Sequence, residues 1–171
     1  MCNIYTTFVP MEKMKTLGDG TPISYTINVR VRLVDLGEPL VMGIMNVTPD
    51  SFYANSRVQT AEAIRQRAHQ IVAQGAKIID IGACSTRPGG VVVSAEEEMQ
   101  RLAFALPIVK EAEPDAILSI DTFHADIARR TIEEFGADII NDVEEGKDPE
   151  MFRTVAELGA PYILMSTLYV F

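Results

Sequence analysis

The sequence predicts an α/β fold built on a parallel sheet, of the (β/α)8 (TIM) barrel type. From residue 40 onward, short apolar runs alternate with stretches that repeat apolar residues at helical spacing. The runs are apolar at successive positions, which is typical of strands in a parallel sheet covered by helices. No run is followed by the G-x-G-x-x-G loop of a doubly wound dinucleotide fold, and this favours the barrel.

The same pattern predicts about five strands and four helices, preceded by a β-hairpin. Residues 23–36 alternate apolar and polar side chains, as a strand or hairpin does. The five apolar runs end near residues 46, 85, 121, 141 and 166. We assign residues 1–22 to an N-terminal extension and residues 23–171 to one partial barrel domain.

Local signals predict where the helices begin and end. The first helix is expected over 61–74, before Gly75. The second begins at Ser94, which forms a capping box with Glu97, and it should bend or end at Pro107. Gly136 should stop the third helix, and the fourth should start at Pro149 after an Asp148 cap.

Composition excludes several classes of protein. The chain has 171 residues, a net charge of −9 and 47% hydrophobic residues, which argues against disorder. An acidic chain without a basic cluster is a poor partner for nucleic acid or an anionic membrane. No apolar stretch is long enough to span a bilayer, no signal peptide is evident, and two cysteines make no disulfide framework. We therefore expect a cytoplasmic protein, with Cys84 as a buried thiol and His69 and His124 as surface residues.

Polar side chains follow four consecutive apolar runs. They are Asn46, Thr86, Arg87, Asp121, Asn141 and Asp142. One such residue alone more often caps the next helix than binds a ligand. In a barrel, however, the carboxyl ends of the strands converge on one face, where the active site is built. Four strand ends of this kind therefore favour a binding site.

The chemistry of these residues suits a heterocycle with an anionic group. The Asp121 carboxylate can accept two parallel hydrogen bonds from an amidine-like N–H pair, as on a 2-aminopyrimidinone ring. The amide of Asn141 offers both a donor and an acceptor. The loop over residues 85–90 supplies a hydroxyl and a guanidinium suited to an anion. Asn46 and Asp50 offer hard oxygen ligands, which favour Mg²⁺.

Four motifs carry a resemblance to a known family. MGIMNVTPDSF (42–52), IDIGACSTRPG (79–89), SIDTF (119–123) and IINDV (139–143) together resemble dihydropteroate synthase. The order and spacing match over about residues 40–165. The resemblance implies a TIM-barrel transferase of folate biosynthesis. Members of that family join p-aminobenzoate to 6-hydroxymethyl-7,8-dihydropterin diphosphate and release diphosphate.

The resemblance also implies roles for individual residues. Asn46 would bind Mg²⁺ together with the diphosphate of the substrate. The substrate-binding candidates are Thr86, Asp121, Asn141, Phe52 and Pro88. Of these, Asp121 and Asn141 would hold the pterin ring, and Pro88 would pack beside p-aminobenzoate. Phe52 and Arg87 would lie on the two loops that close over diphosphate and p-aminobenzoate. The catalytic candidates are Arg87 and Asp50.

The chain departs from the family pattern in three places. Residues 53–56 read Tyr-Ala-Asn-Ser where Ser-Asp-Gly-Gly is usual, and 82–85 read Gly-Ala-Cys-Ser where Gly-Gly-Glu-Ser is common. A full barrel needs about 250 residues, and the family's later Asp-Pro-Gly, Ser-Arg-Lys and Arg-x-His segments are missing here. We therefore expect a truncated barrel that self-associates, as a homodimer or otherwise, and whose own activity is weak or lost.

Two alternative functions stay open from the sequence. The first is a non-catalytic, truncated pterin-binding fragment or assembly unit. The second is the pterin-binding domain of a corrinoid-dependent methyltransferase, which is similar in fold. The NVTPDSF motif favours the synthase.

Overall fold

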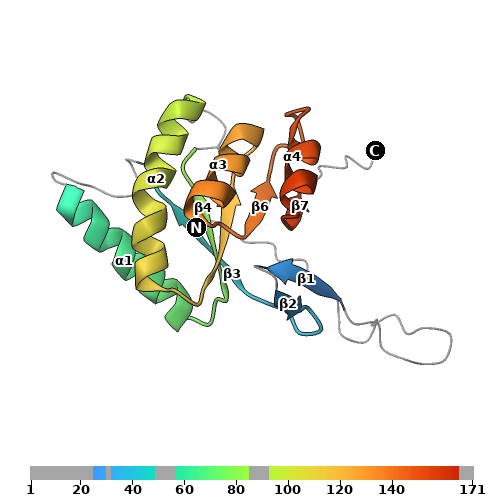
Figure 1. Ribbon diagram of the computed structural model, residues 1–171. Coiled ribbons are helices and arrows are strands. Elements are labelled where there is room, and N and C mark those ends of the chain that lie inside the picture. Colours follow the sequence, from blue (N-terminus) through green and yellow to red (C-terminus); the bar gives the residue numbers. More distant parts are fainter. Residues whose placement is uncertain (1–24, 30–31, 49–56, 85–92, 166–171) are drawn as a thin grey trace, which may run out of the picture.

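A five-stranded parallel sheet and four helices form the body of the protein (Figure 1). In the computed structural model the described residues are 25–29, 32–48, 57–84 and 93–165. The sheet strands are β3 (Met42–Asn46), β4 (Ile78–Gly82), β5 (Ile117–Asp121), β6 (Ile139–Asp142) and β7 (Tyr162–Leu164). The helices are α1 (Arg57–Ala73), α2 (Ala95–Ala112), α3 (Ala125–Phe135) and α4 (Met151–Leu158).

The strands lie in the sheet in the order in which they occur in the chain. The order is β3-β4-β5-β6-β7, and every neighbouring pair is parallel. A doubly wound sheet would reverse direction part-way, whereas a barrel wall adds each strand next to the previous one. Each strand is joined to the next through a helix. The topology is therefore that of a stretch of barrel wall, as the sequence predicts.

One face of the sheet packs against the helices. Alternate strand residues point to this face, and they include Met45, Ile79, Ile81, Leu118, Ile120 and Ile140. They form one core cluster with helix residues such as Ile64, Leu102 and Ile127. Burying each such aliphatic side chain contributes roughly 1.5–3 kcal/mol. Packing against the helices explains only every second apolar residue of a strand. The residues between them point to the opposite face of the sheet.

The β-hairpin covers the other face at the amino ends of the strands. It consists of β1 (Thr26–Val29) and β2 (Arg32–Asp35), paired antiparallel, which confirms the predicted hairpin. Val29 forms a second core cluster with Ile78, Ile117 and Ile139.

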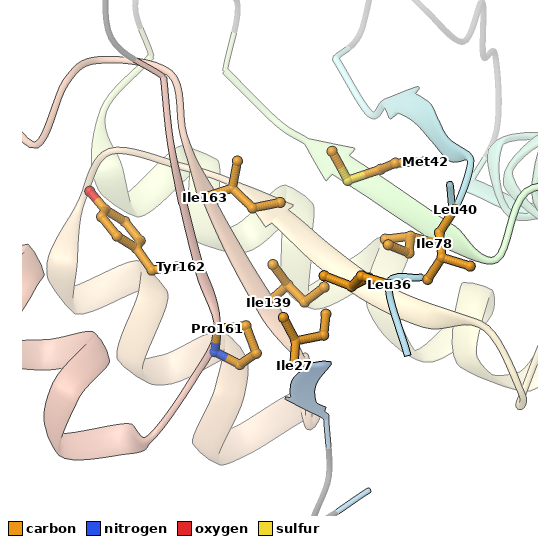
Figure 2. Close-up of a pocket in the computed structure, with 9 residues that line it drawn as sticks. All are labelled: Ile27, Leu36, Leu40, Met42, Ile78, Ile139, Pro161, Tyr162 and Ile163. Atoms are coloured by element: carbon orange, nitrogen blue, oxygen red, sulfur yellow. The ribbon is translucent and has the colours of Figure 1, made fainter. Parts of the chain in front are cut away.

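An apolar cavity of about 330 Å³ lies beside this second cluster (Figure 2). Its lining comes from the hairpin region and from strands β3, β4, β6 and β7. The lining residues are Ile27, Leu36, Leu40, Met42, Ile78, Ile139, Pro161, Tyr162 and Ile163. The amino end of this face is therefore apolar.

Several of the predicted helix ends are confirmed. Ser94 caps α2, because its hydroxyl oxygen accepts a hydrogen bond from the Glu97 backbone N–H at 3.2 Å. Gly136 ends α3 with a φ of 64°, a left-handed conformation that glycine adopts without strain. Among the described residues, no helix is long and apolar enough to cross a membrane.

Three helix predictions need correction. Helix α1 begins at Arg57, four residues before the predicted start at residue 61. Helix α2 does not end at Pro107 but continues to Ala112. Leu106 and Val109 on either side of Pro107 are buried, so packing of the apolar stripe holds the helix together despite one lost backbone hydrogen bond. Helix α4 begins at Met151 rather than at residue 149. Asp148 instead accepts hydrogen bonds from the backbone N–H groups of Glu150 and Ala125, and so ties α4 to the start of α3.

Candidate functional site

Three of the predicted site residues lie in one row at the carboxyl ends of the strands. Asn46 pairs in register with Gly82, Gly82 with Asp121, and Asp121 with Asn141. These four positions are on the face of the sheet away from the helices, because their strand neighbours belong to the helix-side core. The structure therefore brings Asn46, Asp121 and Asn141 onto one surface.

Gly82 leaves space between two of these side chains. A Cβ atom on residue 82 would stand 3.2 Å from Asp121 Oδ2 and 3.3 Å from Asn46 Oδ1. Both oxygen atoms, which come from the neighbouring strands β3 and β5, therefore lie close to the space that a side chain on residue 82 would fill. A larger residue in this place would push them apart, so the glycine permits two oxygen atoms to converge.

Asp80 lies one layer below this row and is almost fully buried. Its Oδ1 accepts a hydrogen bond from Ser119 Oγ at 2.6 Å, and its Oδ2 accepts one from Asn141 Nδ2 at 3.0 Å. A carboxylate accepts hydrogen bonds but cannot donate them. The network therefore links β4, β5 and β6 through buried polar side chains.

The electrostatics of the site raise the pKa of two carboxyl groups. Burial raises the pKa of Asp80, against the opposing effect of its hydrogen bonds from Ser119 and Asn141. The pKa of Asp121 is raised from 3.8 to about 7, mainly by burial and also by the negative charges of Asp80, Glu98 and Asp142. A carboxyl group in such a place favours a ligand that brings N–H donors.

Two more buried carboxyl groups border the site. Glu98 of α2 is fully buried, and its Oε2 lies 3.0 Å from Nδ1 of His124. Its other oxygen has no hydrogen-bond partner in the part of the chain that the structure describes. Asp142 accepts hydrogen bonds from the Glu144 backbone N–H and from the Tyr162 hydroxyl at 2.7 Å. Asp142 therefore holds β7 beside β6, and its hydrogen bonds go to residues outside the row.

Several predicted positions can be compared directly with the structure. Cys84 is buried, as expected. His69 lies 2.6 Å from Glu113 and His124 is paired with Glu98, so each histidine is paired with a glutamate. The remaining predicted site residues lie outside the described residues, and they are Asp50, Phe52, Thr86, Arg87 and Pro88.

The residues that sequence reasoning missed are Asp80, Ser119 and Glu98. Asp80 and Ser119 lie inside the family motifs of β4 and β5, but in the middle of each strand and not at its end. One signal was available for Asp80, because a charged residue in the middle of an apolar strand must have buried partners. No comparable signal marks Glu98, which is one of three consecutive glutamates at the start of α2.

Two oxygen atoms of the row could take part in binding a metal ion. The oxygens of Asn46 and Asp121 that converge above Gly82 are hard ligands of the kind that Mg²⁺ prefers. Within the described ranges, no group of three or more His, Cys, Asp or Glu residues could hold a metal. Mg²⁺ commonly binds through one or two protein oxygens together with substrate phosphates and water. The row fits that mode of binding.

Comparison with known families identifies the chain. Residues 42–168 match the family model described as pterin binding enzyme. The chain belongs to the pterin-binding enzyme family. The matched span contains the whole row of strand ends and all five strands of the parallel sheet.

Similar proteins of this family agree with the fold and the predicted resemblance. The chain is 45% identical over 130 residues to a dihydropteroate synthase of Streptococcus pyogenes, covering 75% of this chain and 48% of that protein. The structure of Xanthomonas albilineans dihydropteroate synthase with 4-aminobenzoic acid aligns with a TM-score of 0.73 and 35% identity, over 86% of this chain and 53% of that one. These matches confirm the resemblance and the partial-barrel fold.

A third similar protein is described with a bound pterin compound. Anaplasma phagocytophilum dihydropteroate synthase, described with bound 6-hydroxymethylpterin-monophosphate, aligns with a TM-score of 0.66 and 36% identity. The alignment covers 73% of this chain and 48% of that one. The chain spans about half the length of the curated synthases that it matches.

Proposed function

We propose that the row of strand ends is the pterin-binding part of a dihydropteroate synthase site. The reaction would join 6-hydroxymethyl-7,8-dihydropterin diphosphate to p-aminobenzoate. The observation that supports this most directly is the shared register of Asn46, Asp121 and Asn141, with the oxygens of Asn46 and Asp121 converging over Gly82. Similar proteins are named for this activity, and one is described with a pterin monophosphate.

The ring would be held through complementary hydrogen bonds. The ionised carboxylate of Asp121 accepts the N–H pair of the aminopyrimidinone edge, and Asn141 binds an adjacent ring atom. Burial makes these bonds strong because few water molecules compete for them. The family resemblance adds Thr86, Phe52 and Pro88 as further substrate contacts.

Substitution at the methylene carbon needs a good leaving group and the exclusion of water. The amine nitrogen of p-aminobenzoate attacks the methylene carbon, the carbon–oxygen bond to diphosphate breaks, and the amine loses a proton. Asn46 would hold Mg²⁺, which neutralises the departing diphosphate when it is bound. Arg87 and Asp50, the catalytic candidates of the two loops, would stabilise the diphosphate charge and complete the ion's ligands.

Calorimetry and turnover test this function separately. Titration with 6-hydroxymethylpterin monophosphate should show binding at one site, and the Asp121→Asn variant should weaken it. Formation of dihydropteroate from the diphosphate substrate and p-aminobenzoate then tests catalysis. Pterin binding without turnover would indicate the non-catalytic alternative, and binding of methyltetrahydrofolate alone would indicate the methyltransferase domain.

Self-association and a cytoplasmic location are part of the same proposal. The face of the sheet away from the helices, here called the inner face, and the ends of the sheet expose apolar side chains, including Ile44, Ile163 and Leu164. Strands β3 and β7 each pair on one side only among the described residues. Exposed strand edges and apolar faces favour pairing with another chain. Light scattering at micromolar concentration should therefore detect a dimer or larger species, and a monodisperse monomer would contradict this.

A further inference from the structure

Asp80 is a buried carboxylate one layer below the row of strand ends. It stands in the middle of β4, and only 3% of its surface is exposed. Its strand neighbours Ile79 and Ile81 belong to the helix-side core, so Asp80 points to the opposite face with Ile78 below it and Gly82 above it. A charged group in this place must be held by hydrogen bonds.

Its two hydrogen-bond partners come from the next two strands. Ser119 of β5 donates to Oδ1 at 2.6 Å, and Asn141 of β6 donates through Nδ2 to Oδ2 at 3.0 Å. Asp80 and Ser119 are register partners, whereas Asn141 stands one layer higher, beside Asp121. The Asp80 carboxylate therefore reaches upward to a residue of the candidate site.

The contact with Asn141 sets the orientation of an amide. A side-chain amide can rotate so that its oxygen and its NH₂ group exchange places, and hydrogen-bond partners decide between the two arrangements. An ionised carboxylate accepts only, so it must face the NH₂ group. The amide oxygen of Asn141, on the other arm, then faces away from Asp80.

We propose that Asp80 is a positioning residue that fixes the Asn141 amide with its carbonyl oxygen available to the ligand. This inference rests on the proposed pterin site. The amide oxygen of Asn141 would then accept a hydrogen bond from an N–H group of the ring, while its NH₂ group donates to Asp80. Ser119 holds the second oxygen of Asp80 but does not touch Asn141's amide in this network. The two partners of Asp80 therefore have separable roles.

A matched pair of variants tests this at pH 8, with 6-hydroxymethylpterin monophosphate as the probe. Asp80→Asn keeps the size of the side chain but can face Asn141 with either an acceptor or a donor, so the affinity should fall about tenfold. Asp115→Asn makes the same change of charge at an exposed position outside this network, so its affinity should stay within about threefold of the unmodified protein. Thermal melts establish that both variants are folded at the temperature of the titration.

A second measurement does not depend on the stability of a variant. In the unmodified protein labelled with ¹⁵N, one Nδ2 proton of Asn141 should be shifted downfield and protected from exchange, and Asn141→Ala would assign the signal. This signal should persist in Asp115→Asn and disappear in Asp80→Asn. Rapidly exchanging, equivalent amide protons in the unmodified protein would overturn the proposal, as would unchanged affinity in Asp80→Asn. If the unmodified protein binds no pterin, the proposed function fails, and the amide signal alone decides the role of Asp80.

Discussion

The two ends of the inner sheet face differ in chemistry although they use the same alternate positions of the same strands. At the amino ends, Ile78, Ile117 and Ile139 pack under the hairpin residue Val29. At the carboxyl ends, the same face carries Asn46, Asp121 and Asn141, with Asp80 and Ser119 one layer below. One face of one sheet therefore changes from an apolar cluster under the hairpin to a polar surface within two layers.

This difference separates stability from binding along the strand direction. The amino end is closed by a segment outside the parallel sheet, and its cavity is lined by apolar side chains and Tyr162 (Figure 2). The carboxyl end instead buries carboxyl groups whose pKa values are raised, which costs stability. Such a cost is typical of a binding surface that is prepared for its ligand.

The largest expected effect is a loss of stability from a cavity at the amino end. Ile139→Ala removes most of a side chain that is 1% exposed, and it should lower the free energy of unfolding by about 3 kcal/mol. Urea denaturation measures this change. Ile163→Ala is the matched control, since Ile163 is 39% exposed and should cost less than about 1 kcal/mol. Equal losses in the two variants would contradict the assignment of the amino end as a core.

The sequence was informative where a local rule decided the structure. The apolar runs predicted the parallel strands, and glycines such as Gly136 marked helix ends because a left-handed conformation suits them. The helix does not end at Pro107, because tertiary packing of α2 outweighs one missing hydrogen bond. Local rules therefore predict where strands and helices form, but they do not predict where tertiary packing overrides a rule.

The candidate site was predictable only in its outer layer. Asn46, Asp121 and Asn141 could be named because they stand where strands end, and barrel topology brings such residues together. The contacts of Asp80 with Ser119 and Asn141 join residues 39 and 61 positions apart, and they depend on strand register. Register across parallel strands is set by the packed sheet, so the second layer of the site could not be predicted from the residues alone.

The next largest effect is a loss of binding at the carboxyl end. Asp121→Asn replaces a carboxylate with an amide, which cannot accept two parallel hydrogen bonds from the pterin edge. Binding of 6-hydroxymethylpterin monophosphate at pH 8 should weaken by about 1–3 kcal/mol in calorimetry. The exposed Asp115→Asn variant has the same change of charge and serves as the control. Equal affinity in all three proteins would show that Asp121 does not bind the ring.

The raised pKa of Asp121 predicts how stability depends on pH. The folded protein holds this proton up to about pH 7, whereas the unfolded chain loses it near the ordinary value of 3.8. The stabilising contribution of the proton is therefore complete below about pH 4 and is lost as the pH rises to about 7. Without ligand or Mg²⁺, unfolding at pH 8 should need about 1–2 kcal/mol less than at pH 5.5. Asp121→Asn should remove much of this difference, and an unchanged pH dependence in that variant would assign it to other groups, such as Asp80.

The smallest expected effect distinguishes two parts of the same ligand. Asn46→Ala removes the amide oxygen that leans over Gly82 from β3, while the contacts of Asp80, Ser119 and Asn141 remain. Binding of the dihydropterin diphosphate with Mg²⁺ should weaken about fivefold, or ~1 kcal/mol. Binding of 6-hydroxymethylpterin, which has no phosphate, should not change. Calorimetry with and without Mg²⁺ measures both affinities. Equal weakening for the two ligands would mean that Asn46 supports the shape of the row instead of holding the ion, and it would place the diphosphate elsewhere on the carboxyl end.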